Sequence, residues 1–69
     1  MEYEIEDILE GDKVYFELDH QNNYGHYWKV TGKRGNLIMV EIDELGHRGW
    51  TTVRLNDILY LERTSPLRA

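Results

Sequence analysis

The sequence predicts an all-β fold of five short antiparallel strands closed into a small barrel. Apolar residues recur at every second position through most of the chain, which is the period of a half-buried strand. Short stretches rich in glycine, aspartate and asparagine interrupt this alternation at intervals typical of hairpins. The chain has 69 residues, 41% of them hydrophobic and 30% charged, so it forms one small domain with one core.

The first two strands are expected at 13–18 and at 27–32, on either side of a long loop at 19–25. A Gly-Asp pair precedes the first strand and serves as a turn signal. In both strands the apolar side chains fall on one face, with polar residues on the other. The core-facing residues predicted here are Val14, Phe16, Leu18, Trp28 and Val30.

The remaining strands are expected at 37–43, 50–55 and 59–62. Their predicted connections are a hairpin loop at 32–36, a turn at 44–49 and one helical turn at 56–58. Asn56 and Asp57 favour that helical turn, because their side chains bond nearby backbone amides. The core-facing residues predicted here are Ile38, Val40, Ile42, Val53 and Leu55.

This order of elements resembles the Tudor and SH3-like small barrels. The likeness covers residues 10–62, which open on EGDKVYFEL and end on VRLNDILYL. Domains of this superfamily open on a Gly-Asp-x-Val strand, place an aromatic-containing strand after a longer loop and close on Val-x-Leu-x-Asp-Ile. The resemblance implies an SH3-like barrel with a 3-10 turn before the last strand. It implies no single function, because unrelated binding domains share this fold.

The sequence divides into an acidic N-terminal arm at 1–9, the barrel at 10–62 and a C-terminal tail at 63–69. Ile5, Ile8 and Leu9 in the arm are expected to form a short helical turn or an irregular cover over one end of the barrel. There is no stretch of about 18 apolar residues and no basic, apolar leader at the start. The chain also has no cysteine, so a cytoplasmic protein is the expected class.

An aromatic cage for a methylated side chain is the first site hypothesis that the sequence raises. Cation–π recognition needs several ring faces around the ammonium or guanidinium group. Tyr24 and Tyr27 (or Trp28) match two of the cage positions that the resemblance to Tudor domains implies. The third position holds no aromatic ring but Ile42, Leu45, Gly46 and His47. The sequence therefore does not favour a reader of methyl marks.

A metal or catalytic centre is the second hypothesis. The three histidines, His20, His26 and His47, lack the spacing that places two ligands on one helix face. No cysteine is present, and the serine and threonines lack an evident histidine base. We therefore expect no enzyme activity, no cofactor and no metal site in this chain.

Binding to nucleic acid is the alternative function left open by the sequence. Lys29, Lys33 and Arg34 form a local basic edge near Tyr27 and Trp50, which are suitable stacking platforms. Thirteen acidic against eight basic residues give a net charge of −5, however, and nucleic-acid binders usually carry a basic excess. Lysine and arginine also commonly protect exposed strand edges and turns from aggregation.

Docking onto a partner protein is the function that the sequence favours, as a subunit or an inhibitor of a larger assembly. Tyrosine, tryptophan and arginine are the residue types most enriched at interface hot spots. The partner-binding residues predicted from the first loop and the strand-three turn are Tyr24, Tyr27, His47, Arg48, Trp50 and Arg54. Trp28 is assigned to the core, whereas the pattern leaves open whether Trp50 is core or surface. The acidic arm would steer the chain toward a basic surface.

Overall fold

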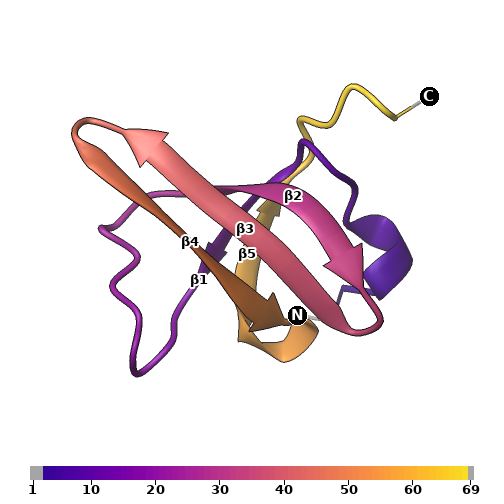
Figure 1. Ribbon diagram of the computed structural model, residues 1–69. Coiled ribbons are helices and arrows are strands. Elements are labelled where there is room, and N and C mark those ends of the chain that lie inside the picture. Colours follow the sequence, from indigo (N-terminus) through magenta and orange to yellow (C-terminus); the bar gives the residue numbers. More distant parts are fainter. Residues whose placement is uncertain (1–2, 69) are drawn as a thin grey trace.

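The fold is a single antiparallel sheet whose strands are connected mainly by tight turns (Figure 1). The structure, a computed structural model, describes residues 3–68; the outermost ends of the predicted arm and tail lie outside this range. The strands are β1 (Lys13–Phe16), β2 (Trp28–Arg34), β3 (Leu37–Glu44), β4 (His47–Arg54) and β5 (Ile58–Glu62). Two 3-10 turns accompany them, η1 (Ile5–Asp7) and η2 (Leu55–Asp57). The predicted all-β fold of five antiparallel strands, with a 3-10 turn before the last, is confirmed.

Several element boundaries differ from the sequence prediction; β2, for example, runs to Arg34, two residues into the predicted loop at 32–36. β1 ends at Phe16, two residues early, because Leu18 leaves the strand to form an isolated bridge with Gln21. The predicted turn at 44–49 is wrong: the turn contains only Leu45 and Gly46, and β4 already begins at His47. The sheet therefore contains a long hairpin of two eight-residue strands where the sequence predicted a loop.

The strand order in the sheet is β4-β3-β2-β1-β5. β2, β3 and β4 form a meander, and β5 returns to pair with the free side of β1. This arrangement places β4 and β5 at the two ends of the sheet, although only η2 separates them in the sequence. In Figure 1 the β3–β4 hairpin projects beyond the other strands at the upper left.

The core lies on one side of the sheet and follows the period-two pattern of the sequence. Trp28 is fully buried, as predicted, and its ring packs edge-on against Phe16 with 5.1 Å between ring centroids. Leu18 and Leu55, also predicted to face the core, are only half-buried at its margin. Full burial of aromatic and branched side chains contributes about 1.5–3 kcal/mol each, so this cluster is the main source of stability. The fully or nearly fully buried apolar residues are Ile8, Val14, Phe16, Trp28, Val30, Ile38, Val40, Ile42, Val53 and Ile58.

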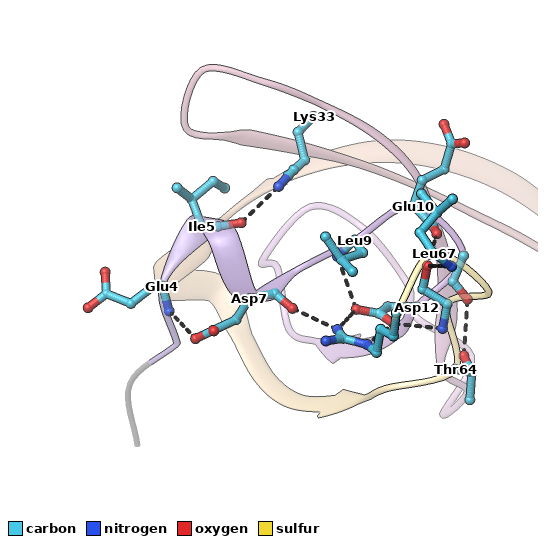
Figure 2. Close-up of polar contacts among 12 residues, drawn as sticks. Glu4, Ile5, Asp7, Leu9, Glu10, Asp12, Lys33, Thr64 and Leu67 are labelled. Carbon is cyan, nitrogen blue, oxygen red and sulfur yellow. Dashed lines mark hydrogen bonds and ion pairs between the residues drawn. The ribbon is translucent and has the colours of Figure 1, made fainter.

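The two ends of the described chain are fastened to each other through Asp12 (Figure 2). Asp12 is fully buried, and its carboxylate accepts hydrogen bonds from the backbone amides of Leu9 and Ser65. The Arg68 guanidinium donates to both carboxylate oxygens and also to the carbonyl of Asp7. We call Asp12, Ser65 and Arg68 the Asp12 clamp, and no local sequence pattern predicts it.

Gly11 makes room for this clamp. Its φ of +97° lies in the left-handed region, which favours glycine, and a Cβ here would lie 2.8 Å from the Pro66 Cδ atom. The Ser65 hydroxyl donates to the carbonyl of Glu10 beside it. The turn residue before β1 is therefore required by the C-terminal segment, not only by the strand.

Candidate docking surface on the β3–β4 hairpin

The β3–β4 hairpin turns through two residues with positive φ, Leu45 at 52° and Gly46 at 83°. Two positive φ values in a two-residue loop define a type I′ turn, in which asparagine or glycine is usual at the first position. A leucine there costs about 1–2 kcal/mol in backbone strain. Leu45 is also 82% exposed, so the core does not compensate for this strain.

The side chains of β4 alternate strictly between the two faces of the hairpin. A Cβ on Gly49 would lie 3.6 Å from the Trp28 ring, which places this position on the inner face. Val53 is buried on the same face, whereas Arg48 and Trp50 point outward. Gly49, which the sequence analysis assigned to a turn, therefore accommodates the largest core side chain.

The backbone of β4 has one paired edge and one edge without a partner strand. Pairing with β3 runs without interruption from Glu44↔His47 to Leu37↔Arg54. In a hairpin with a two-residue loop the closing pair exchanges hydrogen bonds, and every second pair does so thereafter. The amides and carbonyls of Arg48, Trp50 and Thr52 therefore point away from β3. Within residues 3–68 no other strand pairs with β4.

The outer side of this hairpin carries the two most exposed large apolar side chains of the described chain, Leu45 and Trp50. Trp50 is 80% exposed in the middle of a strand, directly across from Glu41. Beside it, the Arg48 Nε atom lies 3.8 Å from the Asp43 carboxylate, and both side chains are largely solvated. We call Leu45, Arg48 and Trp50 the hairpin surface. The sequence left open whether Trp50 is core or surface; it lies on the surface.

The first loop supports the hairpin from the inner side. The Tyr24 ring stacks between Trp28 and His47, with ring centroids 6.2 Å and 4.2 Å away. Tyr24 has a φ of 57°, and its amide donates to the Asn22 side chain. The indole of Trp28 donates to the carbonyl of Asn23. Two predicted partner-binding residues, Tyr24 and His47, thus lie in contact, half-buried beneath the hairpin surface.

Tyr27, another predicted partner-binding residue, lies elsewhere on the molecule. Its ring is 5.7 Å from that of Tyr15, which in turn lies 6.2 Å from Tyr60. These three side chains form a row on the outer side of the sheet, with Tyr15 in β1, Tyr60 in β5 and Tyr27 directly before β2, and we call them the tyrosine face. Sequence reasoning placed Tyr15 on the polar face of its strand but did not join it to Tyr60, because only the β1–β5 pairing brings them together.

The predicted basic residues do not form one patch. Lys29 lies on the outer face between Lys13 and Glu41, and the Lys33 ammonium donates to the Ile5 carbonyl of the arm (Figure 2). Arg34 is exposed at the end of β2, beside the turn into β3. Arg54 ends β4, where its amide donates to the Asp57 carboxylate.

The histidines do not assemble a metal site. His26 lies beside His47, with 6.0 Å between ring centroids. Across residues 3–68 no group of three or more histidine, cysteine or carboxylate side chains has the geometry to hold a metal ion. Every buried side-chain nitrogen or oxygen in the same range has a hydrogen-bond partner.

Among residues 3–68, Asp12 is the titratable group whose pKa is clearly perturbed. Burial acts to raise its pKa, but the hydrogen bonds from Arg68, Leu9 and Ser65 outweigh burial and hold the pKa below its ordinary value of 3.8. This carboxylate lies in the Asp12 clamp, and its bonds tie both chain ends to the start of β1. Its perturbed pKa therefore reflects structural stabilisation.

Comparison with known proteins gives no relative: no family model, no curated protein and no solved structure matches this chain. The resemblance to Tudor and SH3-like barrels thus stays a prediction from the sequence pattern. None of the helical segments that the structure describes has the length and apolar character needed to cross a membrane.

Proposed function

We propose that this chain is a non-enzymatic docking module, a subunit or regulator that binds a partner protein through the hairpin surface. The observation that carries the proposal is the exposure of Leu45 and Trp50 on one projecting hairpin. Exposed apolar side chains are common singly, but an almost fully exposed tryptophan in a strand beside an arginine matches the composition of interface hot spots.

Backbone strain at Leu45 supports the same proposal. Asparagine or glycine would fit the turn better and would expose less apolar surface. A residue that costs stability and gains no burial in the isolated chain is explained if it contacts a partner. Tyr24 and His47 then have a supporting role, because they hold the inner side of the hairpin in place.

Affinity capture from the organism that encodes the chain tests this proposal, using the wild type, Trp50→Ala and Leu59→Ala. Leu59 is 41% exposed on β5, away from the hairpin, and serves as the matched control. We expect wild type and Leu59→Ala to retain the same specific protein. Trp50→Ala should weaken the complex by about 30-fold, corresponding to a hot spot of about 2 kcal/mol.

Thermal unfolding of the variants separates a lost contact from a lost fold. Because Trp50 is solvated, its replacement should change the free energy of unfolding by no more than about 0.5 kcal/mol. Equal capture by all three proteins would show that the hairpin surface is not the docking site.

Binding of single-stranded nucleic acid is the alternative, and the tyrosine face is the observation that favours it. Tyr15 and Tyr27 lie beside Lys13 and Lys29, a combination of rings and cations suited to stacked bases. The nearby carboxylates oppose it, because Glu44 lies 3.8 Å from the Lys13 ammonium.

A titration with single-stranded DNA at two salt concentrations decides between these functions. Salt-dependent binding that is abolished by Lys13→Glu with Lys29→Glu, but not by Trp50→Ala, would establish the alternative. We expect no measurable binding at low salt.

A further inference from the structure

We propose that the unpaired edge of β4, from Arg48 to Thr52, accepts an extended segment of the partner protein as a sixth strand. In this complex a carboxylate side chain of the partner lies opposite Arg48 and an apolar side chain lies opposite Trp50. The inference rests on the proposed function, because it names how the docking surface recognises its partner.

The backbone is the first argument. Three residues of β4 direct their amides and carbonyls away from β3, and eight uninterrupted pairs keep the register of this strand regular. Exposed edges of this kind are templates for strand addition, and proteins usually blunt them with proline, bulges or lysine. β4 has no proline and no lysine, and no bulge interrupts its pairing with β3.

Support from the inner side is the second argument. Tyr24 stacks on His47 and on Trp28, and both contacts are made on the inner face of the hairpin. The edge is therefore held in a strand conformation before a partner arrives. Pre-organisation of this kind reduces the entropy lost on binding.

The side chains specify the chemistry of the added strand. Its nearest neighbours on the outer face are Arg48, Trp50 and Thr52, because directly opposed residues form the closest cross-strand pairs. The ion pair between Arg48 and Asp43 is long and solvated, so the guanidinium is available to a carboxylate on the other side. Asp43 lies one strand further from the added segment, about 10 Å away and largely screened.

The far end of β4 sets a limit on the charge of the occupant. Thr52 and Arg54 border a hollow of about 440 Å³ whose other walls include Glu17, Asp19 and Asp57. These carboxylates repel an acidic segment, and the whole chain carries a net charge of −5. The occupant is therefore a strand with one acidic residue at the Arg48 end and uncharged residues toward Thr52.

The probe is a capped seven-residue peptide, Thr-Thr-Thr-Leu-Thr-Glu-Thr, which in antiparallel register places Leu opposite Trp50 and Glu opposite Arg48. We expect the peptide to shift the amide resonances of Arg48, Trp50 and Thr52 and to slow their hydrogen exchange. The amides of Gly49, Thr51 and Val53, already bonded to β3, should change little. The same peptide N-methylated at the amides that face β4 should not bind.

Charge reversal gives a test that loss of folding cannot imitate. The wild type should prefer the Glu peptide over a Lys-substituted copy by up to about five-fold, the upper end of the effect of one cross-strand pair. Arg48→Glu should reverse this preference. Arg63→Glu, which reverses an exposed arginine just after β5, is the matched control and should preserve it.

Three results would overturn the inference. Equal binding of the N-methylated peptide would place the partner on the face of the sheet and not on its edge. Edge amides that become protected with increasing protein concentration, without peptide, would identify a second copy of the chain as the occupant. Failure of the peptide to perturb these amides would exclude strand addition; if Trp50→Ala still lost the captured protein, the proposed function would nevertheless stand.

Discussion

The Asp12 clamp and the hairpin surface both place a residue in an unusual environment: the clamp buries a charged side chain, and the hairpin exposes a large aromatic one. At the clamp an aspartate, a residue type that is usually solvated, has no exposure and every oxygen bonded. At the hairpin a tryptophan, a residue type that is usually buried, is 80% exposed. The buried charge is explained within the chain by its hydrogen bonds, whereas nothing within residues 3–68 covers the exposed ring. This difference separates a feature that stabilises the fold from one for which we propose a partner.

Replacing Asp12 should have the largest effect on stability. Asp12→Ala leaves the Leu9 and Ser65 amides and the Arg68 guanidinium without their acceptor in a buried site. We expect a loss of about 3 kcal/mol in the free energy of unfolding, measured by urea denaturation. Glu10→Ala, which removes an exposed carboxylate nearby, is the control and should cost less than about 0.5 kcal/mol. Similar losses in both variants would show that the clamp adds no stability.

Replacing a glycine by alanine should have the next largest effect, and it should destabilise the clamp more than the hairpin. Gly11→Ala forces a side chain into left-handed backbone and against Pro66, so we expect a loss of about 2 kcal/mol. Gly49→Ala in the hairpin meets the Trp28 ring at an ordinary contact distance of 3.6 Å and should change stability by less than about 1 kcal/mol. Thermal melts of both variants test this; equal melting temperatures would contradict the close packing at the clamp.

Acid should weaken the Asp12 clamp. The pKa of Asp12 is lowered in the folded chain. Its ionised form therefore stabilises the fold fully at pH values above the ordinary pKa of 3.8. This contribution is lost as the pH falls through the lowered folded-state pKa. Carboxylates titrate between about pH 5 and about pH 2. Urea denaturation over this range should show a steeper loss of unfolding free energy for the wild type than for Asp12→Asn. Parallel profiles would mean that Asp12 does not titrate differently on folding.

Relief of strain at the hairpin should have the smallest effect on stability and the opposite sign. Leu45→Asn gives the type I′ turn its preferred residue, so we expect a gain of about 0.5–1 kcal/mol in the free energy of unfolding. The same variant should weaken partner capture, because it removes an exposed apolar contact. A variant that is both more stable and a better binder would contradict the role assigned to Leu45.

The core and the strand order of the hairpins follow from local sequence patterns and were predictable. Alternation placed Val14, Phe16 and Trp28 on the buried face, and the structure confirms all three. The expected turn at 44–49 was wrong because Leu45 is atypical of a type I′ turn and because Gly49 suggested a loop. In fact Gly49 is in a strand and faces the Trp28 ring from the inner side of the hairpin.

Contacts between distant residues were not predictable. Asp12 and Arg68 are 56 positions apart, and each has the appearance of an ordinary solvated charge in an acidic chain. Of the six residues predicted to bind a partner, Tyr24 and His47 meet beneath the hairpin, whereas Tyr27 joins the tyrosine face. Composition indicated which residue types were suited to binding, but only strand pairing determines which of them share a surface.

Because one tryptophan is buried and the other is exposed, their fluorescence gives two separable signals. Trp28 is enclosed and donates its indole hydrogen to the Asn23 carbonyl, so its fluorescence should be shielded from an ionic quencher such as iodide. Trp50 is almost fully open to water and should be quenched readily. The shielded emission reports whether the chain is folded, and the quenchable emission reports whether the hairpin is covered. One unlabelled sample can therefore follow folding and docking as separate signals.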